Sequence, residues 1–169
     1  MVDHNLLAIN QYKTIVFDCD GVVLDSNVIK TEAYFRTAKN LGASDTQAQA
    51  LVDYHVKLGG ISRYHKFDWF LTEILQQPAT SAAIQTWLDM FASELETGLM
   101  QCTIADGIES LRAHTTGANW MILSGGDQAE IRHLFGRRVL ASGTVLATLF
   151  DGGLFGSPDN KATKQATVK

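Results

Sequence analysis

The fold prediction starts from one stretch near the amino end, Thr14-Ile-Val-Phe-Asp-Cys-Asp-Gly-Val-Val-Leu-Asp-Ser26. Its first four residues are β-branched or aromatic, and they lead directly to Asp18, Asp20 and Gly21. A buried parallel strand ends in this way when it delivers polar groups to the carboxyl edge of a sheet. Because residues i and i+2 of an extended chain point to the same side, we expect both carboxylates to face one pocket.

The paired carboxylates predict a particular chemistry. Two acids that lie close together repel, which favours either a bound divalent cation or a raised pKa on one of them. With Mg²⁺ bound through oxygen ligands, one carboxylate can stay ionised as a nucleophile, and the other can serve as general acid and then as general base. Gly21 permits the sharp exit from the strand. An Asp-x-Asp pair considered alone is more typical of a loop or a calcium site than of catalysis.

The rest of the chain divides into a helical stretch and an alternating one. Apolar residues recur at helical spacing in four consecutive segments, and no strand is predicted among them: Val28–Leu41, Thr46–Leu58, a helix beginning near Ser62, and Ser81–Thr97. Helices and strands then alternate in four further segments: a helix at Ile108–His114, a strand at Trp120–Leu123, a helix at Asp127–Phe135 and a strand at Leu146–Phe150.

This order of elements predicts an α/β fold. We expect a Rossmann-like parallel sheet core, formed by residues 1–26 and 100–169, with an all-helical cap, residues 27–99, inserted between the first two strands.

A second strand end carries candidate phosphate ligands. The strand in Met121-Ile-Leu-Ser124-Gly-Gly126 ends in a hydroxyl and two glycines just before a predicted helix. The hydroxyl of Ser124 and the amides of Gly125 and Gly126 can together form a cradle for a phosphate group. The alternative is that Ser-Gly-Gly is only a turn.

The segment Lys57-Leu-Gly-Gly-Ile-Ser-Arg63 joins two of the predicted cap helices. Gly60, Ser62 and Arg63 are candidate substrate ligands, because a guanidinium binds phosphate or carboxylate through two parallel hydrogen bonds. The alternative is a glycine-rich helix break in which Ser62 caps the next helix, and the residue can do both.

The first stretch closely resembles the first motif of the haloacid-dehalogenase-like phosphohydrolases, a strand followed by Asp-x-Asp-Gly-Val-x-x-Asp-Ser. The resemblance implies that Asp18 attacks phosphorus to form an aspartyl phosphate, and that Asp20 protonates the leaving oxygen and later activates water. It also implies that the Asp18 carboxylate and the backbone carbonyl of Asp20 bind Mg²⁺. The dehalogenase branch lacks the second aspartate, so Asp20 favours phosphoryl transfer.

Further segments extend the resemblance. Ser124 matches the second motif, a hydrophobic strand that ends in Ser or Thr. The segment Phe155-Gly-Ser-Pro-Asp-Asn-Lys161 is similar to the third, which implies that Lys161 neutralises charge on Asp18 and on the transferred group. The segment that ends at Arg63 looks like the cap specificity loop of β-phosphoglucomutase and phosphoglycolate-phosphatase-type members. The expected function is Mg²⁺-dependent hydrolysis of a small phosphorylated metabolite.

The resemblance also implies a fourth, acidic motif after the lysine, which completes the magnesium site, and no such motif occurs up to Lys169. Asp151 precedes the lysine, so we do not expect it to replace the missing acidic motif. We expect either a truncated chain, which binds Mg²⁺ weakly, shows little or no phosphatase activity and associates through an open sheet edge, or a missing edge supplied by another chain.

Two other functions stay open from the residues. One is a sugar-phosphate mutase, although Lys30 stands where β-phosphoglucomutase-like enzymes have a histidine. The other is a non-catalytic remnant that binds a partner or a phosphate group without turning it over.

Composition narrows the partners and the compartment. The net charge is −4 and no basic stripe occurs, so a nucleic-acid partner is not expected. No apolar run approaches the ~18 residues that span a bilayer, and the stretch Met1–Lys13 lacks the apolar segment of a signal peptide. Two cysteines, Cys19 and Cys102, are expected to be free thiols. These features predict a cytoplasmic globular protein.

Overall fold

The computed structural model describes residue 9 and residues 11–157. The chain forms two compact units. The first, the sheet unit, comprises Met1–Asp25 and Thr103–Lys169, and the second, the helical unit, comprises Ser26–Cys102. Lys161, which the sequence singles out, lies outside the described residues.

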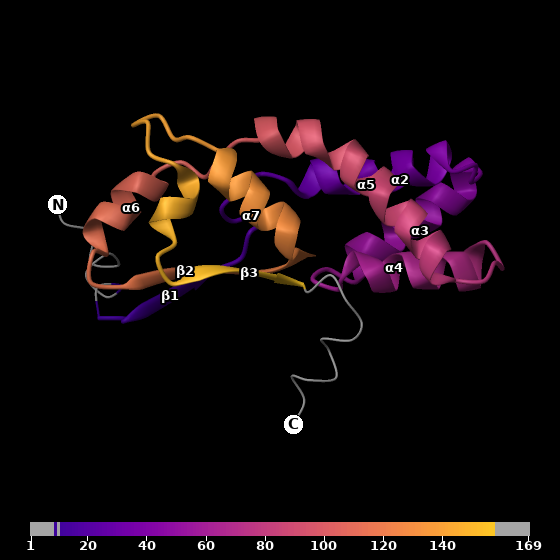
Figure 1. Ribbon diagram of the computed structural model, residues 1–169, viewed down its shortest axis with the longest axis horizontal. Coiled ribbons are helices and arrows are strands. Elements are labelled where there is room, and N and C mark those ends of the chain that lie inside the picture. The colour runs from indigo at the N-terminus through magenta and orange to yellow at the C-terminus, as the bar shows by residue number, and fades with distance from the viewer. Residues whose placement is uncertain (1–8, 10, 158–169) are drawn as a thin grey trace, which may run out of the picture. The chain divides into compact units, whose positions relative to one another are not determined.

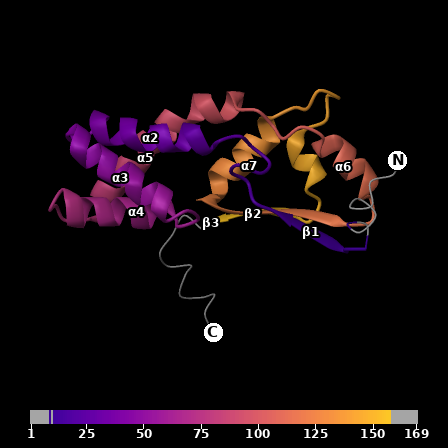
Figure 2. The same cartoon turned by 180° about the vertical axis from the view of Figure 1, so that it is seen from behind.

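The sheet unit is built on three parallel strands, β1 (Thr14–Phe17), β2 (Asn119–Asp127) and β3 (Gly153–Ser157), in the order β1-β2-β3. The connections from β1 to β2 and from β2 to β3 both move to the next strand on the same side. Because crossovers between parallel strands are right-handed, the helices in both connections lie on one face of the sheet. Figures 1 and 2 show α6 (Ile108–His114) and α7 (Gln128–Arg137) over the same face. The prediction of a parallel α/β sheet is confirmed.

Aromatic side chains fill the covered face. The ring of Phe17 lies 4.5 Å from that of Trp120, and Phe150 packs edge-on against Phe17 and Phe135. The indole nitrogen of Trp120 donates a hydrogen bond to the hydroxyl of Thr115 at 3.0 Å, so the buried tryptophan has its polar atom satisfied. This core fixes α6 and α7 on the sheet and thereby holds the carboxyl ends of the strands.

The opposite face of the sheet is apolar and open in the described part of the chain. Strand alternation and register put Val16, Leu123 and Phe155 on this face, and they are 55%, 63% and 43% exposed. No described strand pairs with the outer edge of β1.

The predicted strand at Leu146–Phe150 is wrong. Leu146–Leu149 form a short 3-10 helix, η2, whose three-residue repeat buries Leu146 and Leu149 together. A short apolar run gives no periodicity that separates a strand from a buried turn. The third strand is the glycine-rich segment that follows, where Gly153 has φ +113° and an added Cβ at Gly152 would lie 2.9 Å from the carbonyl oxygen of Trp120.

The second predicted strand is longer than expected. It continues past Leu123 through the glycines to Asp127, and α7 begins only at Gln128. The carboxylate of Asp127 caps this helix by accepting hydrogen bonds from the amides of Ala129 and Glu130. A serine and two glycines give a weak strand signal, which is why the sequence places the strand end too early.

The helical unit contains α2 (Asn27–Asn40), α3 (Asp45–Lys57), α4 (Arg63–Trp69), the π-helical turn η1 (Phe70–Ile74) and α5 (Ser81–Gln101), close to the four predicted segments. Ser44 begins α3 with a capping box closed by Gln47. Helices α2 and α5 pack so closely that Gly98 of α5 leaves no room for a side chain. A Cβ added there would lie 2.7 Å from the side chain of Ile29 in α2. No helix among the described residues is long and apolar enough to cross a membrane.

The core of the helical unit is also aromatic. The ring of Tyr34 lies 4.3 Å from that of Phe91 and 5.6 Å from that of Phe67, and all three side chains are buried. At the surface Arg36 joins α2 to α5 through an ion pair with Glu94 at 2.8 Å, and this hydrogen bond raises the pKa of the guanidinium.

Candidate active site

Asp18 and Asp20 follow β1 in a tight hydrogen-bonded loop. The amide of Cys19 donates to Oδ1 of Asp18 at 2.7 Å, which holds that carboxylate at the strand end. The amides of Val23 and Leu24 both donate to the carbonyl of Cys19, at 3.1 and 2.9 Å, and thereby close the loop. Asp18 is exposed and Asp20 is half-buried, so both carboxylates lie on the outer side of the loop.

Apolar side chains anchor this loop from inside. Cys19, Val23 and Leu24 are each at most 2% exposed, and the amide of Ala105 donates to the carbonyl of Val23 at 2.9 Å. Gly21 has φ +72°, which L side chains rarely adopt, so the turn between the aspartate pair and the anchor requires glycine. Cys19 is thus buried between the exposed Asp18 and the half-buried Asp20.

Register places the second candidate group beside the first. Phe17 of β1 pairs with Ile122 of β2, so Asp18 and Leu123 follow at the same level and Ser124 comes one residue later. The hydroxyl of Ser124 accepts a hydrogen bond from the amide of Gly126 at 3.0 Å. A hydroxyl that accepts in this way can still donate its own proton to a ligand.

Ser124, Gly125 and Gly126 form a bulge in β2. Pairing between β2 and β3 runs as far as Leu123 opposite Phe155 and resumes at Asp127 opposite Ser157. Three residues of β2 thus stand opposite the single residue Gly156. The expected helix-terminal cradle is therefore a strand bulge, and such bulges are typical of sites where a chain must present backbone groups.

Sequence reasoning missed Gln128, the first residue of α7. Its side-chain nitrogen donates to the carbonyl of Leu154 at 2.9 Å, and its side-chain oxygen accepts from the amide of Gly156 at 2.8 Å. The only signal in the sequence is an amide side chain directly after Ser-Gly-Gly-Asp.

Metal-ligand groups are few at this strand end. No three side chains of His, Cys, Asp or Glu come together as a metal cluster in the part of the chain that the structure describes. Asp18 and Asp20 suit Mg²⁺, which is held by one or two carboxylates together with waters and substrate phosphate oxygens.

Asp151 has a structural role, at the other end of β2. Its Oδ1 accepts from the amide of Trp120 at 2.9 Å, and its Oδ2 pairs with Arg112 at 2.7 Å. The hydrogen bond from Trp120, followed by that from Arg112, lowers the pKa of the Asp151 carboxyl. These contacts agree with the expectation that Asp151 does not act as a magnesium ligand.

Residues Gly60, Ser62 and Arg63 lie together at the start of α4. Gly60 has φ +80°. Ser62 makes no side-chain capping bond, and its buried Oγ has no hydrogen-bond partner among the described residues. Arg63 is only 6% exposed, and its guanidinium carbon lies 4.9 Å from the centre of the Phe91 ring.

A second buried cation follows one helical turn later. Lys66 is 2% exposed, and its Nζ lies 2.8 Å from Nδ1 of His55 and 5.5 Å from the ring centre of Tyr34. A lysine ammonium has no acceptor, so Nδ1 of His55 is the acceptor of this bond and His55 is neutral when Lys66 is charged. Sequence reasoning missed this pair, which sets a second buried basic side chain one helical turn after Arg63.

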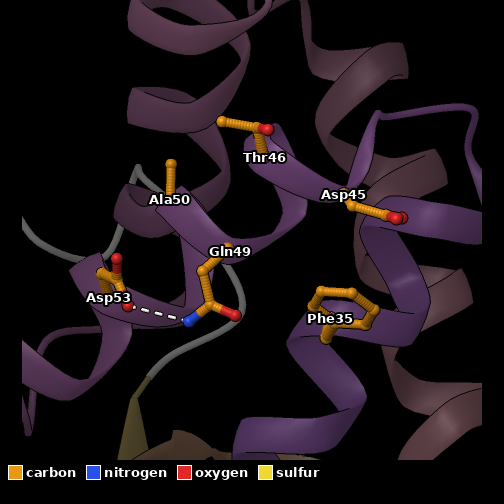
Figure 3. Close-up of a pocket in the computed structure, with 6 residues that line it drawn as sticks. All are labelled: Phe35, Asp45, Thr46, Gln49, Ala50 and Asp53. Atoms are coloured by element: carbon orange, nitrogen blue, oxygen red, sulfur yellow. Dashed lines mark hydrogen bonds between the residues drawn. The ribbon is translucent and has the colours of Figure 1, made fainter.

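A pocket on α2 and α3 does not include any candidate site residue (Figure 3). Phe35 contributes to its lining, together with the acidic residues Asp45 and Asp53. Gln49 donates a hydrogen bond to Asp53 at 2.9 Å, and Asp45 pairs with Lys39 outside the lining. A lining with two carboxylates does not suit a phosphate group.

Comparison with known proteins decides the family. The sequence profile of the haloacid dehalogenase-like hydrolases matches residues 12–167. The chain belongs to this family. No curated protein matches the chain.

Solved structures of this family share its fold. A predicted phosphatase from Clostridium acetobutylicum is 18% identical, with a TM-score of 0.62 over 94% of this chain and 72% of its own. A predicted phosphoglycolate phosphatase from Haemophilus somnus 129PT is 15% identical, with a TM-score of 0.58 over 86% of this chain and 63% of its own. CbbY from Rhodobacter sphaeroides, solved with phosphate, is 16% identical, with a TM-score of 0.61 over 86% of this chain and 64% of its own. The chain thus spans less than two thirds of the length of the last two proteins.

Proposed function

We propose that this chain carries the nucleophile of a magnesium-dependent phosphohydrolase that acts on a small phosphorylated metabolite. The observation that supports the proposal is the pairing of β1 with β2, whose register, continued by one residue, brings the exposed Asp18 level with Leu123, one residue before the bulge that begins at Ser124. A nucleophile next to a hydroxyl and backbone amides is the arrangement that phosphoryl transfer needs. The phosphate in the CbbY complex supports phosphate as the ligand class.

The proposed reaction has two steps. Asp18 attacks phosphorus, and its bond to phosphorus forms as the bond to the leaving oxygen breaks, while Asp20 donates a proton to that oxygen. Asp20 then accepts a proton from a water molecule, which attacks the aspartyl phosphate and releases inorganic phosphate.

Other residues would bind charge rather than react. The hydroxyl of Ser124 and the amide of Gly125 would hold the phosphoryl oxygens, joined by the amide of Gly126 once it gives up its hydrogen bond to Ser124. Lys161 would neutralise the charge of these oxygens. The carboxylate of Asp18 and the carbonyl of Asp20 would hold Mg²⁺, which supplies positive charge to the phosphate dianion when bound. With one carboxylate and one carbonyl as proposed ligands, we expect weak affinity for Mg²⁺, in the millimolar range or weaker.

The helical unit is proposed to act as the substrate-selecting cap. Arg63 and the unpartnered hydroxyl of Ser62 would bind an anionic group of the substrate remote from the reacting phosphate, and Gly60 would allow the loop to approach it. The nearby ammonium of Lys66 supports an anionic ligand at this segment.

The test is hydrolysis of p-nitrophenyl phosphate by the wild-type chain with and without Mg²⁺, compared with Asp18→Asn. We expect any Mg²⁺-dependent turnover, however slow, to fall by at least ~10³-fold in the variant. Asp106→Asn is the matched control, because Asp106 is another exposed aspartate of the sheet unit, and it should retain activity.

Equal rates for Asp18→Asn and the wild type would refute the assignment of the nucleophile. Magnesium and phosphate binding without any turnover would favour the non-catalytic alternative. Transfer from a sugar bisphosphate to a sugar phosphate would identify a mutase.

A further inference from the structure

The bulge in β2 interrupts the hydrogen bonding between β2 and β3 where the candidate phosphate ligands lie. Leu154 and Gly156 of β3 stand on either side of Phe155, which pairs with Leu123 in the last regular pair before the bulge. Beyond this pair, regular pairing of β2 with β3 resumes only at Asp127 opposite Ser157. The conformation of the bulge therefore depends on contacts other than the ladder.

Gln128 supplies such a contact. A carboxamide side chain carries one acceptor and a donor in the same plane, as a peptide group does. Its nitrogen donates to the carbonyl of Leu154 at 2.9 Å, and its oxygen accepts from the amide of Gly156 at 2.8 Å. The side chain therefore ties the first turn of α7 to β3 beside the bulge.

The fit around these two hydrogen bonds is tight. A Cβ added to Gly156 would lie 2.7 Å from the carbonyl oxygen of Gly126, 2.9 Å from Cα of Gln128 and 2.9 Å from Cδ1 of Ile131. The bulge is thus confined between β3 on one side and the start of α7 on the other. Loss of the Gln128 bonds would release the bulge from β3.

We infer that Gln128 is a positioning residue for phosphate binding. It touches no substrate, and it acts by holding Ser124, Gly125 and Gly126 in the bulged conformation. This inference rests on the proposed function, because it assigns a purpose to the bulge only if the bulge binds a phosphoryl group. A residue in this role affects phosphate affinity through Ser124, so the effects of the two residues should be coupled.

The experiment titrates inorganic phosphate into the ¹⁵N-labelled 169-residue chain and follows the amide resonances of Gly125 and Gly126. Gln128→Leu removes both hydrogen bonds at similar volume, and Gln128→Glu keeps only the acceptor for Gly156. We expect the dissociation constant for phosphate to rise about tenfold or more in Gln128→Leu and less in Gln128→Glu, as the loss of two bonds and of one bond implies. The control is Gln85→Leu, which removes an exposed side-chain hydrogen bond to Asp89 in the helical unit and should leave phosphate binding unchanged.

Two further readouts separate positioning from general stability. Hydrogen exchange at the Gly156 amide should accelerate in Gln128→Leu, while the amide of Trp120, which bonds Asp151, keeps its protection. In a Ser124→Ala background the Gln128→Leu change should add little further loss of affinity.

The outcomes distinguish this inference from the function on which it rests. Absence of any phosphate-dependent shift in the wild type would refute the proposed function and this inference with it. Wild-type binding that Ser124→Ala weakens and Gln128→Leu leaves intact would overturn the inference alone. Independent, additive effects of the two substitutions would also overturn it, because they would show that Gln128 does not act through the bulge.

Discussion

Gly156 lies so close to Gly126 that a Cβ at position 156 would be 2.7 Å from the carbonyl oxygen of Gly126. The contact is with backbone, which cannot rotate away, so Gly156→Ala should push β3 from the bulge. We expect the free energy of unfolding to fall by ~1–3 kcal/mol, the usual effect of overpacking. Chemical denaturation measures this change.

Gly136→Ala is the matched control for that substitution. Gly136 lies within α7, and an added Cβ would meet no atom within 4 Å. Alanine is a better helix former than glycine, so this variant should gain up to ~1 kcal/mol. If both variants change stability in the same direction, the close approach of β3 to the bulge is not the cause.

We expect the free energy of unfolding to depend on pH through the carboxyl group of Asp151. Hydrogen bonds from Trp120 and Arg112 lower the pKa of its carboxyl in the folded state. Because the pKa is lower in the folded state, the stabilisation is fully present at a pH above the pKa of the unfolded state, ~4. It is lost as the pH falls through the lower pKa of the folded state. The ion pair is exposed, so we expect no more than ~1 kcal/mol.

The measurement compares the wild type with Asp151→Asn across pH 2–7 by urea denaturation. The difference in unfolding free energy should be largest at neutral pH and shrink below about pH 4. A difference that stays constant across this range would show that the carboxylate charge does not contribute.

Arg63 predicts selectivity for substrates with a second anionic group. Arg63→Ala should raise KM for such a phosphorylated substrate far more than for p-nitrophenyl phosphate, which lacks that group. Arg63→Lys should restore little, because an ammonium cannot form the paired hydrogen bonds of a guanidinium. Arg36→Ala, at an exposed arginine of the same unit, is the control. Equal changes in KM for both substrates would indicate that Arg63 serves only to pack against Phe91.

The open face of the sheet predicts self-association. Leu123 and Phe155 are exposed on it, and burying them against a second copy would remove apolar surface from water. Sedimentation velocity should show concentration-dependent association that Leu123→Ser weakens. Val56→Ser, at an equally exposed apolar residue of the helical unit, should have no effect. Association that both variants weaken equally would argue against the sheet face.

The sequence predicted what depends on local pattern. The strand before Asp18, the turn at Gly21 and the helices of the helical unit follow from residue type and periodicity, and the structure contains them. The β3 strand was missed because glycines are typical of turns, whereas here Gly156 is required by the close approach of β3 to the backbone of Gly126.

Gln128 escaped prediction for a different reason. Its role depends on the register between two strands that are far apart in the sequence, and no local pattern reports that register. The buried contact between Lys66 and His55 was missed in the same way, because it joins two helices whose pairing is set only in the folded unit.

The central claim is that Asp18 becomes phosphorylated. The chain is mixed with a phosphomonoester and Mg²⁺, quenched in acid and treated with borohydride, which reduces an acyl phosphate to an alcohol. Mass spectrometry of the peptides then locates the modified residue. We expect homoserine at position 18, and none in Asp18→Asn. Hydrolysis of the ester with no reduced residue at position 18, or with the modification at another residue, would contradict it.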